Sequence, residues 1–193
     1  MTETSLSLLE RLQQQPDDVS WQKLVDIYAP LIGRWLMRSP LQKADHEDLV
    51  QEVLKIVVQK LPEFQRRREG SFRAWLRVVS VNCLREFWRS SKHQPVATGD
   101  SNFLQQLQEL EDPHSALAQA WDTEHDRYVV RRLLEIIEPQ FEPTTRQAFR
   151  RVVLEREKPA AVAAELGISV NAVFLAKSKI LRQLRKEIDG FLS

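Results

Sequence analysis

Residues 159–178, PAAVAAELGISVNAVFLAKS, form the most specific local pattern in the sequence. Two helices that meet at a tight turn need a small residue where they cross, apolar inner faces and a residue that tolerates positive φ at the turn. Ala163 fits the crossing, Gly167 fits the turn, and Ser169 can cap the second helix. The positions expected on the inner faces are all apolar: Val162, Leu166, Ile168, Val173 and Ala176. The pattern predicts a helix-turn-helix, with an ordinary helical hairpin as the alternative.

The second helix of such a unit enters the major groove of DNA, where its first residues reach the base edges. Asn171 can pair with adenine, and Val170 or Phe174 can contact a thymine methyl group. Basic residues further along the helix can hold phosphates, which adds affinity but does not distinguish sequences. Two alternatives stay open: Phe174 packs in the core, and the later basic side chains only face solvent. The candidate DNA-binding residues are Ser169, Val170, Asn171, Phe174, Lys177, Ser178, Lys179 and Arg182.

Helical periodicity extends through most of the chain. Apolar residues recur at spacings of three and four in four further segments, residues 21–35, 49–61, 72–87 and 117–137. Pro30 lies inside the first segment and is expected to bend that helix or divide it in two. No segment shows the sustained alternation or the turn dipeptides of a β-hairpin. The sequence therefore predicts an all-α protein.

The pattern fails over residues 93–112, where turn-forming residues predominate. This segment is predicted to be a flexible acidic linker. It joins two small helical domains, residues 1–92 and 113–193. A short apolar stripe inside the linker is compatible with a transient helix or a docking segment; its members are Phe103, Leu104, Leu107 and Leu110.

Charge is distributed unevenly along the chain, although the whole has a net charge of only +1. Residues 1–92 carry +3, residues 93–143 carry −7 and residues 144–193 carry +5. Two basic ends suggest two modules that each meet a polyanion. The alternative is that these charges only solvate helix surfaces. The acidic middle segment could mask the basic faces in the free protein.

Several classes of protein are excluded by composition. No uninterrupted apolar run exceeds five residues, and the N-terminus lacks the pattern of a signal peptide, so we expect a cytoplasmic protein without membrane insertion. Cys83 is the only cysteine, which excludes a disulfide framework and a multi-cysteine zinc site. There is no glycine-rich phosphate loop and no recognisable nucleophile–base arrangement. The acidic residues near His46 lack a second ligand cluster, so we expect no metal, no cofactor and no enzymatic activity.

Two stretches of the N-terminal half are less generic, residues 45–54 (DHEDLVQEVL) and residues 64–82 (FQRRREGSFRAWLRVVSVN). Asp48, Gln51 and Glu52 share one helical face, because residues three and four apart are neighbours on a helix. Asp45 is expected to stabilise the start of the same helix. Consecutive arginines precede a helix in which basic and aromatic residues are interspersed. This combination suits melted DNA, whose exposed bases stack on aromatic rings.

In this order, the two stretches resemble region 2 of bacterial RNA polymerase sigma-70 family factors, particularly the extracytoplasmic-function group. Residues 162–185, VAAELGISVNAVFLAKSKILRQLR, are similar to region 4.2, which recognises the −35 element. The resemblance covers roughly residues 20–92 and 124–188. It implies an alternative sigma factor that binds core RNA polymerase and directs promoter-specific initiation. The alternative is a stand-alone helix-turn-helix regulator, which would not need the acidic face or the arginine loop.

The resemblance also assigns roles to residues and names partners. It implies docking on the β′ clamp helices by Asp48, Leu49, Gln51 and Glu52. It implies contact with the −10 element of promoter DNA by Phe64, Arg66, Arg67, Arg68, Ser71, Asn82, Arg85, Arg89 and Lys92. A satisfied buried amide is the alternative for Asn82, and a solvated loop for the three consecutive arginines. The β flap would meet the helices before the recognition helix, around Phe149, Val152 and Val153. The resemblance also admits an anti-sigma factor as a partner.

Two positions depart from the pattern of the family. The end of the −10 helix, LREFWRSSKH at residues 84–93, has fewer paired arginines than many relatives. The recognition helix begins with apolar residues, Val170, Phe174 and Leu175, where many relatives are more polar. The base preference of this helix is therefore open, and its apolar start could also indicate a surface for another protein.

Overall fold

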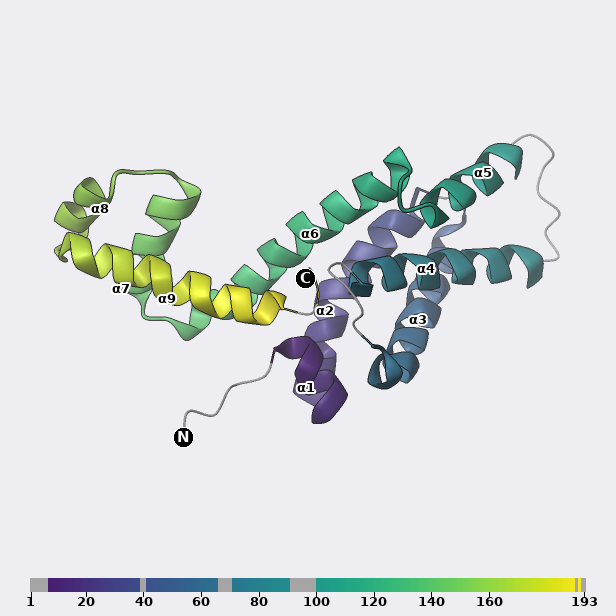
Figure 1. Ribbon diagram of the computed structural model, residues 1–193, viewed down its shortest axis with the longest axis horizontal. Coiled ribbons are helices and arrows are strands. Elements are labelled where there is room, and N and C mark those ends of the chain that lie inside the picture. Colours follow the sequence, from purple (N-terminus) through teal and green to yellow (C-terminus); the bar gives the residue numbers. More distant parts are fainter. Residues whose placement is uncertain (1–6, 39–40, 66–70, 91–99, 190, 192–193) are drawn as a thin grey trace. The chain divides into compact units, whose positions relative to one another are not determined.

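The computed structural model describes residues 7–38, 41–65, 71–90, 100–189 and 191 (Figure 1). Within these ranges every regular element is a helix, which confirms the all-α prediction. The elements are α1 (Leu8–Gln14), α2 (Asp18–Leu36), α3 (Lys43–Lys60), η1 (Leu61–Glu63), α4 (Ser71–Ser90), α5 (Asp100–Glu111), α6 (Ala116–Ile137), η2 (Glu138–Gln140), α7 (Pro143–Phe149), the π-helical turn η3 (Arg150–Leu154), α8 (Pro159–Leu166) and α9 (Val170–Ile188).

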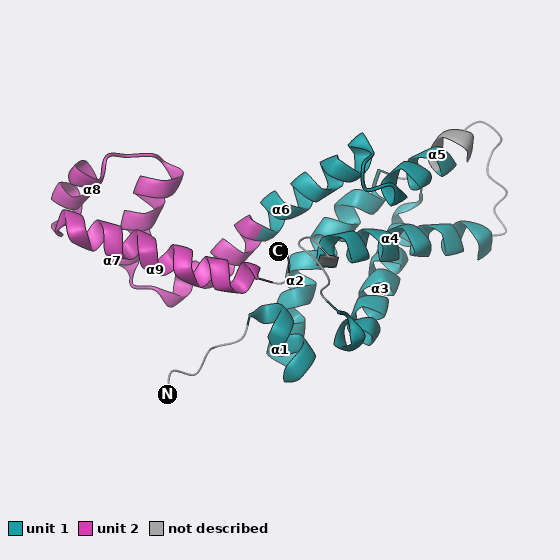
Figure 2. Ribbon diagram, viewed as in Figure 1, with its two compact units in different colours: residues 1–129, 190–193 teal, residues 130–189 magenta. Residues whose placement is uncertain are grey.

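The chain divides into two compact units (Figure 2). Unit 1 comprises residues 1–129 and 190–193, and unit 2 comprises residues 130–189. The division therefore falls inside α6, later in the chain than the predicted linker at 93–112. The last residues of that segment form α5, which packs against α4 and buries Leu107. In this structure the short apolar stripe is a docked helix of unit 1.

The core of unit 1 forms where α2 packs on α3, α3 on α4 and α4 on α5. Asp17 caps α2 by accepting a hydrogen bond from the backbone N–H of Ser20 at 2.8 Å. The expected division of this helix at Pro30 is not found, since α2 is one element from Asp18 to Leu36. Its buried residues flank the proline on both sides, and their packing offsets the missing backbone hydrogen bond.

The start of α3 is fixed by backbone contacts. Its N-cap residue is Gln42, and no side chain caps the first turn. Asp45 lies in the first turn, where its negative charge interacts favourably with the helix dipole. The ring of His46 instead joins α3 to α2, because its nitrogens lie 2.9 Å from the carbonyl oxygens of Gln42 and Leu36.

Unit 2 contains the predicted helix-turn-helix. Val162, Ala163, Val173 and Ala176 form a buried cluster with Ala148, and Leu166 and Ile168 pack against it. Gly167 occupies the turn with φ 65° and ψ 30°, a conformation that side chains with a Cβ rarely adopt. Ser169 caps α9 by accepting the N–H of Ala172 at 3.1 Å. The predicted packing, turn and capping roles in the motif are confirmed.

Among the described helices, none alone combines the length and apolarity needed to cross a bilayer. The pair α8 and α9 reaches that length and composition only when both are taken together across a bend of 105°.

Candidate nucleic-acid and protein interfaces

The first turns of α9 present their predicted base-contacting side chains to solvent. Asn171 is exposed, as is Val170 at 40% of its surface. Phe174 is 50% exposed, so the alternative that it packs in the core is wrong. The buried residues of the helix, beginning with Val173 and Ala176, face the helix-turn-helix core. Helix α9 therefore has an inner apolar face in the core and an outer, exposed face that is able to contact the major groove of DNA.

The later basic residues of α9 are also exposed. Lys177, Ser178, Lys179 and Arg182 all face solvent. Among the described residues, no ion pair engages the two lysines or Arg182, whereas Arg151 of η3 is paired with both Glu157 and Glu165. The cations along α9 are thus available to phosphate groups, while that of Arg151 is used within unit 2.

In unit 1, the predicted polymerase-docking residues lie on α3. Asp48, Gln51 and Glu52 are exposed, and Glu52 lies 3.1 Å from the Nζ of Lys55. Leu49 is only 3% exposed, so it supports this face from beneath and does not project from it. A groove between α3 and α4 adjoins these residues. Its lining includes three acidic side chains and no Lys or Arg: Asp48, Leu49, Glu52, Ile56, Asn82, Cys83, Glu86, Phe87 and Ser90.

Cys83 in this groove is not a reactive thiol. Burial raises its pKa to about 11, and the negative charge of Glu52 acts in the same direction. A thiol with so high a pKa is almost entirely protonated near neutral pH, and only the thiolate is a nucleophile or metal ligand. Among the described residues, no group of three or more His, Cys, Asp or Glu side chains could hold a metal ion.

Some of the predicted −10 residues lie in an aromatic cluster or on the exposed surface of α4, and others lie outside the described ranges. Phe64 belongs to an aromatic cluster, with ring centroids 5.7 Å from Phe72 and 5.2 Å from Trp75. Asn82 is exposed at the acidic groove, so the buried-amide alternative is wrong. Arg89 is also exposed, 3.9 Å from Glu86. Outside the described residues lie Arg66, Arg67, Arg68 and Lys92, as does the side chain of Ser71.

Arg85 differs from the other predicted −10 residues because it is already paired. Both of its terminal nitrogens donate to the carboxylate of Glu111 on α5, one of them at 2.8 Å. This two-bond geometry is the one by which guanidinium groups also bind phosphate. In the structure, the carboxylate of Glu111 therefore occupies the guanidinium group of Arg85.

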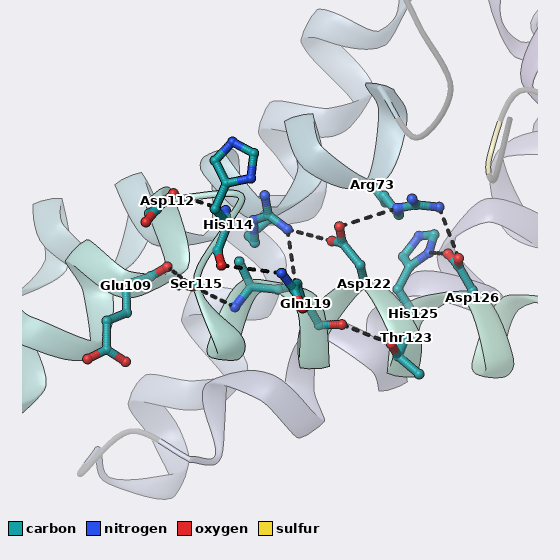
Figure 3. Close-up of polar contacts among 12 residues, drawn as sticks. Arg73, Glu109, Asp112, His114, Ser115, Gln119, Asp122, Thr123, His125 and Asp126 are labelled. Carbon is teal, nitrogen blue, oxygen red and sulfur yellow. Dashed lines mark hydrogen bonds and ion pairs between the residues drawn. The ribbon is translucent and has the colours of Figure 1, made fainter.

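Two further arginines of α4 meet acidic residues of α6, and Figure 3 shows the contacts of one of them, Arg73. Arg77, 3% exposed, donates to Asp122 and to the carbonyl oxygen of Ala118. Arg73 bridges two carboxylates, with its nitrogens 3.5 Å from Asp122 and 2.9 Å from Asp126. The sequence predicts the basic residues of this helix only as contacts to DNA. The matched i, i+4 spacing of Arg73/Arg77 and Asp122/Asp126 is the signal that points to their pairing.

His125 completes this network from inside the core. Its Nδ1 lies 3.0 Å from Asp126 Oδ1, and its Nε2 lies 3.2 Å from the hydroxyl of Tyr28. The ring is fully buried, and burial lowers the pKa of His125 although Asp126 acts in the opposite direction. The neutral ring thus satisfies a tyrosine hydroxyl of α2 and a carboxylate of α6. It serves the packing of unit 1.

One expected protein contact is contradicted by burial. Phe149, placed by the resemblance at the β flap, is 1% exposed and belongs to the interior of unit 2. Val152 packs partly against the helix-turn-helix cluster. The exposed apolar residue of this segment is Leu154, at 50%.

One comparison with known protein families bears on the N-terminal helices. Residues 24–94 match the family model for sigma-70 region 2. The match begins inside α2 and includes all of α3 and α4, the helices that carry the acidic face and most of the predicted −10 residues. A solved structure of CnrH in complex with the cytosolic domain of CnrY is 18% identical, with 94% of this chain and 95% of that chain covered and a TM-score of 0.37. Comparison with the curated proteins gives no match. Residues 24–94 are therefore similar to region 2 of the sigma-70 family.

Proposed function

We propose that this protein is a sigma factor of the extracytoplasmic-function group, which binds core RNA polymerase and directs initiation at promoters with a −10 and a −35 element. The observation that carries the proposal is a sigma-70 region 2 at residues 24–94 followed, in the same chain, by a helix-turn-helix with an exposed recognition helix. The protein itself is not the catalyst, because the polymerase makes the phosphodiester bonds.

Docking on the polymerase is assigned to the exposed face of α3. Asp48, Gln51 and Glu52 are available in the free protein, and the adjoining groove adds Glu86 from α4. Such a face fits a basic partner surface, because complementary charges steer the two proteins together and orient them. The resemblance identifies that partner as the clamp helices of β′. The assignment of the β flap to unit 2 rests on the resemblance alone.

Recognition of the −10 element is assigned to region 2. Asn82 and Arg89 are exposed on α4 and would supply amide and cationic contacts. Phe64 precedes this helix and packs in an aromatic cluster with Trp75. Bases of a melted strand stack on aromatic rings, and capture of an unstacked base offsets the cost of opening the duplex. The arginines at 66–68 would add phosphate contacts.

Recognition of the −35 element is assigned to α9. Its exposed N-terminal residues are suited to base edges and its later lysines to phosphates. The domains inferred from the sequence are residues 1–92 for the −10 element and 113–193 for the −35 element. Because residues 113–129 belong to unit 1, the proposal assigns the −35 role to unit 2, residues 130–189. Because such a factor works with core polymerase, we propose a cytoplasmic location; an anti-sigma factor is a further proposed partner.

A pair of variants tests the −35 assignment on the complex with core polymerase. Asn171→Ala is expected to reduce discrimination against a wrong base by about 1–3 kcal/mol at one position, because the amide reads a base edge. Lys179→Ala is expected to weaken binding to all fragments evenly and to lower the salt dependence by about one phosphate contact. Competition binding over single-base variants of the −35 element measures both. Equal loss of discrimination in the two variants would contradict the assignment.

The stand-alone regulator is distinguished by a footprint with and without core polymerase. The proposed function predicts protection of two promoter elements only when the polymerase is present. Protection of one site by the protein alone, unchanged by core, would favour the regulator.

A further inference from the structure

The surface of α4 and the segment that covers it are opposite in charge. Helix α4 has four arginines and one glutamate, whereas residues 100–126 have seven acidic residues and no Lys or Arg. Three of the four arginines are paired with this acidic segment: Arg73, Arg77 and Arg85. The fourth, Arg89, pairs within α4. Figure 3 shows the part of this contact that involves Arg73, Asp122 and Asp126.

Apolar contacts hold the acidic segment in place. Leu107 of α5 and Trp121 of α6 are each 2% exposed, and Ala118 is fully buried. The ring of Trp121 packs against Trp35 of α2, with centroids 4.4 Å apart. The charge pairing is therefore part of a packed interface within unit 1 and positions each carboxylate beside its arginine.

The three ion pairs are not equivalent. The Arg77 side chain is 3% exposed, so its pairing with Asp122 is structural, and loss of one partner would leave a buried charge. The side chains of Arg85 and Glu111 are 28% and 36% exposed. Pairs that water reaches contribute only about 0–1 kcal/mol and are weakened by salt. The Arg73 side chain is 21% exposed and bridges two carboxylates. The pair between Arg85 and Glu111 is the most exposed of the three and is held by a single carboxylate, so it is the one that a competing anion replaces most easily.

We propose that Glu111 is an internal competitor of nucleic-acid phosphate: its carboxylate occupies the Arg85 guanidinium in the free protein and must leave before Arg85 can bind promoter DNA. This inference rests on the proposed function, which places Arg85 on the −10 DNA. The competing ligand is a phosphodiester oxygen, which accepts the same two hydrogen bonds as the carboxylate. Release of Arg85 couples DNA binding to a local movement at the end of α5.

A double-mutant cycle on the full chain tests this competition. The variants are Glu111→Gln, Arg85→Ala and their combination, and the probe is a fluorescein-labelled single-stranded oligonucleotide of random sequence, because phosphate contacts do not depend on sequence. Glu109→Gln is the matched control, since Glu109 lies on the same helix and its side chain accepts a bond from Gln105 and not from an arginine. Circular dichroism checks that each variant is folded.

We expect Glu111→Gln to tighten binding roughly two- to five-fold more than Glu109→Gln at low salt, in line with the strength of an exposed ion pair. In the Arg85→Ala background, the two substitutions should have equal effects. Equal effects in the wild-type background would overturn the competition and leave the sigma-factor function standing. Unchanged DNA binding by Arg85→Ala alone would overturn both the competition and the −10 role of Arg85. Core-dependent initiation is measured separately and tests the sigma-factor function; neither of these two DNA-binding results decides it.

Discussion

Replacing Asp48 and Glu52 with lysine is expected to abolish binding to core RNA polymerase, with a loss of affinity of roughly 100-fold or more. Both carboxylates are exposed on α3 and line the acidic groove. Lysines there would face a basic partner with like charge, and such juxtaposition costs several kcal/mol at an interface. Since both side chains are at the surface, the free energy of unfolding should change by only about 0.5 kcal/mol. Biolayer interferometry with immobilised core polymerase measures the binding.

A control with the same change in net charge isolates the face from the overall charge. Glu47→Lys with Glu63→Lys adds equal positive charge at two exposed residues of unit 1 that do not line this groove. That double variant should bind core polymerase within about three-fold of the wild type, in keeping with a general charge effect on association. Retained binding by the Asp48/Glu52 variant would contradict the assignment of this face to the polymerase.

Trp121→Ala is expected to destabilise unit 1 by about 3–5 kcal/mol, the usual cost of truncating a large buried aromatic residue. Trp121 packs on Trp35 and lies among the largest buried side chains of the chain. Its removal opens a cavity beneath α4, next to the Arg77–Asp122 pair. Hydrogen exchange in urea, followed at amides of α2 and α4, measures the loss.

The position of Trp121 makes this variant a test of where unit 1 ends. Leu104→Ala on α5 is the control, because Leu104 is 55% exposed and its truncation should cost only about 0.5 kcal/mol. Loss of protection in α2 and α4 is the expected result for Trp121→Ala. Loss confined to α7, α8 and α9 would show that residues 116–129 belong with unit 2, as the sequence boundary at 113 implied.

The helix-turn-helix could be predicted from sequence almost residue by residue because its determinants are local. A glycine that adopts φ 65°, a serine cap and a small residue at the crossing lie within seven positions of one another. Their requirements are steric and do not depend on distant partners. The predicted crossing residue, turn and cap of α8 and α9 accordingly agree with the structure.

The role of residues 100–129 could not be predicted in the same way. Acidic composition and turn-forming residues predict a linker over residues 93–112 and a second domain from residue 113, but the pairing partners of Glu111 and Asp122 lie 26 and 45 residues away in the chain. Only the tertiary fold brings them together. Helix α1 was missed for another reason: it is short, although Ser7 and Glu10 form a capping box that the sequence contains.

Exposed residues of the candidate site can be predicted from the sequence where their exposure follows from helical spacing. They cannot be predicted where packing between distant segments decides which side chains are buried or paired. The exposed face of Asp48, Gln51 and Glu52 follows from positions three and four apart. The burial of Phe149 and the occupation of Arg85 depend on neighbours from other helices. A family resemblance assigns roles to residues by their position in a motif, so it does not reveal which residues of other helices bury or pair with them.

Run-off transcription with purified bacterial core RNA polymerase, the full chain and a library of promoter fragments tests the central claim most directly. The proposed function predicts transcripts that require both proteins, from a subset of fragments that share two sequence elements at one fixed spacing. Absence of transcripts from every fragment, together with sequence-specific DNA binding that does not need core polymerase, would contradict the sigma-factor function and favour a stand-alone regulator.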